Sequence, residues 1–382
     1  MNKITEADLY LIRLYYRSSE NIVINEKLLI GNSLAVYALV PFVPRYDETE
    51  AKILLNLTAG AYSTDPEKCV NNTLPKWQKW LICNTKSTIC DAFQNFCSLY
   101  IIRSDVMKEI IIVFRGTTTT KQLIVEGWQS MRSKKNFFNI GMVNRYFLQA
   151  LDKTWPNMEP LLMNPLFKSY QVKFTGHSLG GAIASLAATR TVIQRLRTGN
   201  QIKLITFGQP RTGDYQFATY HNTYIPFSFR LVHHLDLVPH LPPCEKDANY
   251  RNEKNDKSKP CLTGKIGSPY HHGIEIWYPN GMAKDAMYYE CLGYPKSEDF
   301  RCSNSLTYDF KNYNAYVNDH RHYFDVHLSS YGNRGCTQIQ TDLLLSKPSR
   351  FAPYINAASQ KFQEIKQRIS GLLNFFKKDK IS

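Results

Sequence analysis

The stretch that decides the fold is Phe174-Thr175-Gly176-His177-Ser178-Leu179-Gly180-Gly181-Ala182. It places the pattern G-x-S-x-G between an expected strand, 170–175, and an expected helix, 179–197. A sharp turn from strand to helix holds a serine hydroxyl clear of the backbone in a strained conformation, which tolerates only small neighbours. We therefore predict a nucleophile elbow formed by Gly176, His177 and Gly180, with Ser178 as the nucleophile.

Outward from this turn, apolar runs predict strands at 109–114, 170–175, 202–207 and 227–232. The run 109–114 is almost entirely β-branched, as in a strand that is covered on both faces. Helical patterns separate the runs: apolar residues recur every four positions from 143 to 155, and 179–197 is rich in alanine. The alternation predicts an α/β fold of the α/β-hydrolase type, with a mainly parallel central sheet flanked by helices. A later run, 274–278, enters a Pro-Asn-Gly turn and predicts one more strand, whereas 40–108 and 240–310 are expected to wrap the core.

A serine nucleophile needs an imidazole to accept its proton and a carboxylate to orient that imidazole. In this fold the chain order is Ser, then Asp, then His, and Asp236 follows the run 227–232 at the point where strands carry catalytic groups. The backbone amide of Leu179, at the start of a helix, is expected to face the developing oxyanion. Several histidines follow Asp236, so these rules leave the choice of base open.

Three motifs resemble the class 3 (fungal-type) lipases: GHSLGGA at 176–182, FRGT at 114–117 and DLVPHLPP at 236–243. The resemblance covers roughly residues 45–336 and is strongest to secreted animal members, which share YHHGIEIWYPNG and DHRHYF. It identifies His320 as the base because DHRHYF matches the family's H-x-x-Y-F stretch, with His322 as the runner-up. It also implies that Thr117 contributes its amide and hydroxyl to the oxyanion hole.

The same resemblance implies a lid after the oxyanion residue. Its candidate residues are Leu123, Ile124 and Trp128, in an amphipathic segment that also carries basic residues. Such a flap would cover the serine in water and turn its apolar face toward a lipid surface. The alternative is an ordinary surface helix.

Nine cysteines fall in loop-like segments, a distribution typical of disulfides and of an oxidising compartment. Their spacing is wider than that of zinc-binding pairs, so no metal site is expected. Proximity predicts Cys90–Cys97, Cys244–Cys261 and Cys291–Cys302; the resemblance adds Cys69–Cys336 and leaves Cys83 over. An apolar run at 28–43, with cleavage after Ala38, predicts a secretion signal, although the residues before it lack the usual excess of positive charge. The alternatives are a signal anchor, or a buried strand or helix.

The chain of 382 residues is expected to comprise an extension (1–44), one catalytic domain (45–340) and a basic tail (341–382). From residue 347 the tail holds eight Lys or Arg against two acids, in an amphipathic helical pattern that could contact anionic membrane or pack on the domain. Although the net charge is +15, no pattern of a nucleic-acid-binding module is present. A monomer is expected.

The predicted reaction is two-step acyl transfer to water at a lipid interface, and it requires no metal or organic cofactor. Triacylglycerol is the first substrate class, and phospholipid (A1-type cleavage) and feruloyl-type esters remain alternatives. The rival from another class is a secreted protein that binds lipid without turnover.

Overall fold

The computed structural model describes residues 22–30, 34–41, 44–90, 96–117, 133–251, 258–293, 295 and 297–337, the first two ranges as backbone only. A sheet of eight strands forms its centre, in the order β14-β13-β11-β9-β8-β5-β4-β3. These strands are β3 (Trp80–Ile89), β4 (Phe96–Ser104), β5 (Glu109–Phe114), β8 (Gln171–His177), β9 (Ile202–Phe207), β11 (Phe227–His233), β13 (Ile274–Tyr278) and β14 (Tyr289–Cys291).

The five strands from β13 to β5 run parallel, and β14, β4 and β3 pair antiparallel at the two edges. The expectation of a mainly parallel sheet is confirmed, and each of the five predicted strands is present. The segment 40–108, which was expected to wrap the core, covers the sheet with α2 (Glu48–Gly60) and in addition extends it with β3 and β4.

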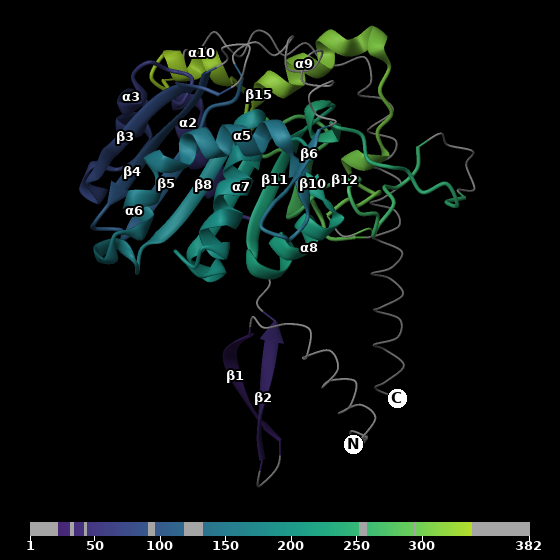
Figure 1. Ribbon diagram of the computed structural model, residues 1–382, viewed down its shortest axis with the longest axis horizontal. Helices are drawn as coiled ribbons and strands as arrows, with labels where there is room; N and C mark the ends of the chain where they lie inside the picture. Colours follow the sequence, from purple (N-terminus) through teal and green to yellow (C-terminus); the bar gives the residue numbers. More distant parts are fainter. Residues whose placement is uncertain are drawn as a thin grey trace.

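Helices cover both faces of the sheet (Figure 1). One face carries α5 (Arg145–Thr154) and α7 (Leu179–Ile193), and the other carries α2 (Glu48–Gly60), with α3 (Pro66–Thr73) and α10 (Leu328–Asn333) packed against it. Alternate residues of β5 enter the two cores: Ile110, Ile112 and Phe114 pack on the α7 side, and Ile111 and Val113 on the α2 side. The continuous apolar run of this strand thus follows from burial on both of its faces.

Smaller elements surround this three-layer body. A second sheet has the order β12-β10-β7-β6, and β15 pairs with β16. The remaining elements with regular structure are α6 (Glu159–Met163), α8 (Tyr215–Tyr224), α9 (Tyr313–Arg321), β6 (Lys134–Asn136), β7 (Met142–Asn144), β10 (Gly213–Asp214), β12 (Pro269–Tyr270), β15 (His322–Tyr323) and β16 (Val326–His327), together with short 3-10 turns.

Four disulfides link the described cysteines: Cys69–Cys336, Cys90–Cys97, Cys244–Cys261 and Cys291–Cys302. All four expected pairings are confirmed, and Cys83 is a free, exposed thiol on β3. The first disulfide joins α3 to the segment that follows α10 and closes a separation of 267 residues.

Two further predictions concern the ends of the chain, the apolar run near the N-terminus and the basic C-terminal tail. The apolar run 28–43 overlaps β1 (Ile22–Ile30) and β2 (Leu34–Pro41), which form a separate antiparallel pair. The basic tail, 341–382, lies outside the described residues, which end at 337. None of the helices in the described ranges is long and apolar enough to span a membrane.

Candidate active site

Ser178 occupies the turn between β8 and α7. Its φ of 59° and ψ of −128° lie outside the conformations that non-glycine residues ordinarily adopt. A Cβ on Gly176 would come within 2.4 Å of the backbone of Gly180, so the turn can close only with glycine at that position. The predicted elbow is therefore a strained, tightly packed strand-to-helix turn.

The parallel strands bring the other predicted residues to the same edge of the sheet. Asp236 follows β11, Thr117 follows β5, and β8 lies between these strands with β9 beside it. His320 comes from the last turn of α9, far along the chain from the other groups. The convergence arises because the carboxyl ends of neighbouring parallel strands share one edge.

Asp236 and His320 form a buried pair. The Nδ1 atom of His320 lies 2.9 Å from Oδ2 and 3.1 Å from Oδ1 of Asp236, and both residues are almost fully buried. The Tyr323 hydroxyl donates to the same Oδ2 at 2.7 Å, and the Val238 amide donates to Oδ1 at 2.9 Å. Burial raises the pKa of Asp236, but the adjacent His320 and these hydrogen bonds outweigh it and hold the pKa below its usual value.

His320, rather than the runner-up His322, lies beside Asp236. The Nδ1 atom of His322 instead lies 2.7 Å from the Asn318 carbonyl oxygen. With Nδ1 of His320 occupied by the carboxylate, its Nε2 is the nitrogen available for a serine proton. This Nε2 is buried and has no hydrogen-bond partner among the described residues.

The loop after β5 lies against the nucleophile. A Cβ on Gly116 would be 3.2 Å from Cβ of Ser178 and 2.5 Å from the carbonyl oxygen of His177. Thr117, the next residue, has a buried hydroxyl oxygen that is likewise without a partner in the described part of the chain. The amide of Leu179 stands at the first position of α7, where the helix dipole favours negative charge. These groups could stabilise an oxyanion beside Ser178.

Three residues of this site were not singled out from the sequence. Tyr323 lies within the quoted H-x-x-Y-F stretch, so its proximity to His320 was available as a signal. Gly208 directly follows the predicted strand 202–207, and a Cβ there would be 2.8 Å from both Asp236 Oδ2 and His320 Nδ1. Tyr62, whose hydroxyl contacts His177, carries no local sequence signal.

The predicted lid has no structural description. Its candidates Leu123, Ile124 and Trp128 belong to 118–132, which lies outside the described residues.

One group of side chains with metal-ligand spacing occurs in the described ranges, Glu275 with Cys291 and Cys302. The two cysteines are joined as a disulfide, and the Glu275 carboxylate accepts hydrogen bonds from Ser303.

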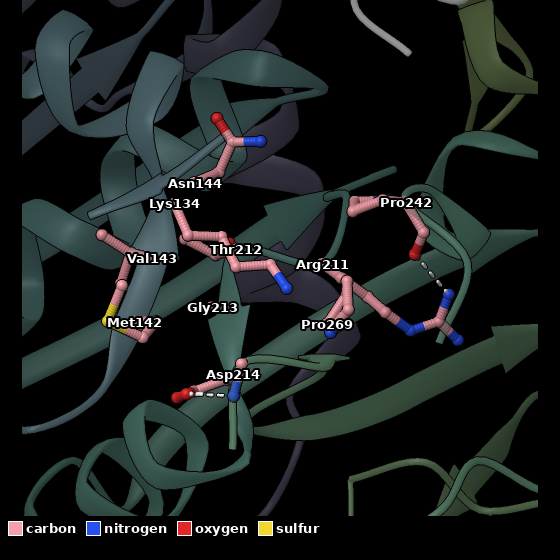
Figure 2. Close-up of a pocket in the computed structure, with 11 residues that line it drawn as sticks. Lys134, Met142, Val143, Asn144, Arg211, Thr212, Gly213, Asp214, Pro242 and Pro269 are labelled. Atoms are coloured by element: carbon pink, nitrogen blue, oxygen red, sulfur yellow. Dashed lines mark hydrogen bonds between the residues drawn. The ribbon is translucent and has the colours of Figure 1, made fainter. Parts of the chain in front are cut away.

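A shallow hollow lies on the small sheet (Figure 2). It encloses about 230 Å³, including space open to solvent, and residues of β6, β7 and β10 line it. Asp214 at its rim accepts a hydrogen bond from the Gly267 amide at 2.8 Å, and Arg211 donates to the Pro242 carbonyl oxygen at 3.2 Å. None of the residues Ser178, Asp236 and His320 lines this hollow.

Comparisons with known proteins agree with this architecture. The lipase (class 3) family model matches residues 111–246. A Caenorhabditis elegans protein named as a lipase is 42% identical over 298 residues, which is 78% of this chain and 84% of that protein. A Rhizopus niveus lipase is 30% identical over 257 residues, or 66% of this chain and 57% of the relative.

Solved structures extend the likeness to three dimensions. The lipase of Rhizopus microsporus var. chinensis superimposes with a TM-score of 0.56 at 24% identity, covering 75% of this chain and 93% of that one. A fungal lipase–inhibitor complex gives a TM-score of 0.56 at 25% identity, covering 74% and 96%. The fold is that of an α/β-hydrolase. The chain belongs to the class 3 lipase family and is a carboxylic ester hydrolase.

Proposed function

We propose that the protein is a lipase that hydrolyses triacylglycerol, with Ser178 as nucleophile, His320 as base and Asp236 as the orienting carboxylate. The observation that carries the proposal is the buried His320–Asp236 pair, 2.9 Å apart, at the sheet edge where the strained Ser178 stands. Family membership and relatives named as lipases support the activity on lipid esters.

In the proposed reaction Ser178 attacks the ester carbonyl and gives its proton to Nε2 of His320, which then protonates the leaving alcohol. Asp236 holds Nδ1–H and stabilises the imidazolium. The amides of Leu179 and Thr117, with the Thr117 hydroxyl, donate to the oxyanion. Water then attacks the acyl-enzyme and gives a proton to His320. His320 returns this proton to the Ser178 oxygen as the bond to the acyl group breaks, and the fatty acid leaves.

The proposal also covers where the reaction takes place, at a lipid surface and outside the cell. We expect a lid at Leu123, Ile124 and Trp128 that opens at a lipid surface, and contact of the basic tail with anionic membrane. Secretion through the run 28–43 belongs to the same proposal. It is supported by four disulfides and by kinship with a Fusarium solani protein named as a secreted mono- and diacylglycerol lipase, 30% identical over 149 residues.

The test measures hydrolysis of p-nitrophenyl esters of short and long chains, below and above the aggregation limit, by the wild type and by Ser178→Ala. We expect turnover only by the wild type, and faster turnover on aggregated long chains. His320→Ala should lose activity by at least about a thousandfold, whereas the matched control His322→Ala should stay close to wild type. Turnover confined to soluble short esters would identify an esterase without interfacial activation, and inactive wild type with intact disulfides would favour lipid binding without catalysis.

Substrate class is decided by direct comparison. Triolein emulsion, phosphatidylcholine vesicles and methyl ferulate are supplied to the same preparation, and released acid is titrated. The proposal requires triolein to give the highest rate. A higher rate on phosphatidylcholine or on ferulate would replace it with phospholipase A1 or feruloyl-type esterase activity.

A further inference from the structure

A chain of contacts connects the loop after β5 with the backbone of His320. The partly buried Tyr62 hydroxyl packs on Gly116, where an added Cβ would come within 2.4 Å of it. The same hydroxyl lies 2.7 Å from Nδ1 of His177, and Nε2 of His177 lies 2.7 Å from the carbonyl oxygen of His320. Two residues outside the Ser178–His320–Asp236 set thus span the site.

The chemistry of the partners fixes the direction of each bond. A carbonyl oxygen only accepts, so Nε2 of His177 carries the hydrogen and donates to His320. In the neutral ring Nδ1 is then an acceptor, and the Tyr62 hydroxyl must donate to it. Both hydrogen bonds therefore run in one direction, from Tyr62 through His177 to the His320 carbonyl oxygen.

The surroundings keep His177 in the neutral state that this direction requires. The side chain is nearly buried, at 5% exposure, and its ring centroid lies 4.4 Å from that of His320. Burial, followed by the charge of the neighbouring His320, lowers the pKa of His177 to about 3. A protonated His177 would present N–H to Tyr62 and reverse that bond.

The chain is also held by close packing. A Cβ on Gly116 would come within 2.4 Å of the Tyr62 hydroxyl, so the hydroxyl occupies space that only glycine leaves open. Tyr62 therefore lies directly against the loop that carries Thr117. His320 is consequently held at two places: its ring by Asp236 and its backbone by His177.

We propose that Tyr62 and His177 are positioning residues, which fix the oxyanion loop and the catalytic histidine relative to each other through the chain Gly116–Tyr62–His177–His320. The inference rests on the proposed function, since it assumes the roles of Ser178, His320 and Thr117. It predicts an effect on the rate of the chemical step and little effect on binding of a small ester, because a misplaced reacting group costs rate without removing a substrate contact.

The decisive variant is Tyr62→Phe, which removes the hydroxyl and keeps the ring. We expect kcat on a soluble short p-nitrophenyl ester to fall about tenfold or more with KM within about twofold. The matched control is Tyr100→Phe, because the Tyr100 hydroxyl also makes a single strong hydrogen bond, donating to the Leu57 carbonyl oxygen at 2.6 Å, away from the site. The control should lose thermal stability to a similar extent but keep wild-type kcat.

A second pair of variants tests His177 itself. Glutamine offers a carbonyl to Tyr62 and an amide donor to His320, so His177→Gln should retain much of the kcat that His177→Phe loses. In the wild type, ¹⁵N NMR should identify His177 as the Nε2–H tautomer. This measurement uses only the wild-type protein, so it does not depend on whether a variant folds. The Nδ1–H tautomer would overturn the inference.

The outcomes separate this inference from the proposed function. If Ser178→Ala is inactive and Tyr62→Phe loses no more kcat than Tyr100→Phe, positioning is refuted and the proposed function stands. If Ser178→Ala retains wild-type turnover, both are refuted. Inactive Ser178→Ala together with a specific loss of kcat in Tyr62→Phe, and rescue by His177→Gln, supports both.

Discussion

Gly208 shows how much of the site depends on the absence of a side chain. It has a φ of +57° and stands where a Cβ would lie 2.8 Å from both Asp236 Oδ2 and His320 Nδ1. Glycine there leaves space for the acid and the imidazole to meet. Any larger residue has to push one of them aside.

We therefore expect Gly208→Ala to lower kcat/KM on short esters by about tenfold to a hundredfold, since displacements near 1 Å are costly in a catalytic site. The matched control is Gly264→Ala, which has a similar positive φ of +79° but nothing within 4 Å of the added Cβ. Alanine at a positive φ should lower the melting temperature of both variants to a similar extent, and only Gly208→Ala should lose activity. Equal activity in the two would contradict the steric explanation.

Tyr323 acts on the site through the carboxylate. Its hydroxyl donates to Asp236 Oδ2, one of the bonds that keep the pKa of Asp236 low. Tyr323→Phe removes this donor, so the pKa of Asp236 should rise. A lowered carboxyl pKa contributes stability that is lost as the pH falls from the unfolded-state pKa to the folded-state pKa. The variant, whose folded pKa is higher, should therefore lose less stability in acid and complete that loss at a higher pH than wild type.

Thermal unfolding of Tyr323→Phe and wild type between about pH 6 and pH 3 checks this expectation. At pH 6 the variant should be less stable by about 1–3 kcal/mol, the usual effect of removing one partner of a buried hydrogen bond to a charged group. The difference in stability between the two proteins should shrink as the pH falls toward 3, and a difference that stays constant over this range would count against the expectation.

Among the elements, the first and last parts of the domain depend on each other. Cys69 in α3 bonds Cys336 beyond α10, and Asn72 donates to the Gly335 carbonyl oxygen at 2.7 Å. The disulfide closes 267 residues, whereas Cys90–Cys97 closes 7 residues between the edge strand β3 and its neighbour β4. In the chain-entropy description a longer closed loop stabilises the folded state more.

We expect the double variant Cys69→Ala/Cys336→Ala to lower the free energy of unfolding by about 3–5 kcal/mol, against about 1–2 kcal/mol for Cys90→Ala/Cys97→Ala. Denaturant unfolding of both double variants and wild type measures the difference. The short-loop variant serves as the control for loss of a buried cystine as such. A larger loss in the short-loop variant would show that local strain or packing, rather than loop length, dominates.

For the whole molecule, the number of buried histidines determines how stability responds to pH. Burial lowers the pKa of His177, His221 and His240 to about 3, and lowers those of His271 and His272 well below the ordinary value. Above about pH 6.5 these side chains are neutral in both folded and unfolded chains, so their titration carries no penalty. Below that pH the unfolded chain binds protons that the folded protein does not.

Stability should therefore fall as the pH drops from about 6.5 toward 4, by up to about 1.4 kcal/mol per pH unit for each such histidine. Glu275, whose pKa burial raises, acts in the opposite direction near its own titration. It is a single group against these five histidines and His233, whose pKa burial also lowers. Melting temperatures at constant ionic strength from pH 7.5 to pH 4.5 test the expectation. A melting temperature that does not change over this range would be inconsistent with buried neutral histidines.

What the sequence determined by itself was local. The β-branched run of β5, the alanine-rich α7 and the G-x-S-x-G turn each encode their structure in neighbouring residues, so strand, helix and elbow could be predicted in place. Three disulfides between near neighbours followed from proximity, and the fourth from family resemblance. Thr117, Asp236 and His320 were chosen by chain order and motif, which give candidates but no contacts.

The tertiary structure decided what depends on residues far apart in the chain. It alone placed His320 instead of His322 on Asp236, and brought Gly208 and Tyr62 to the site. It also showed that β3 belongs to the central sheet. The residues of this edge strand are polar and exposed, so the sequence did not predict it, because pairing with β4 and not burial of both faces holds the strand in place. The contacts that assemble the site join positions that are distant in sequence, and local propensity carries no record of them.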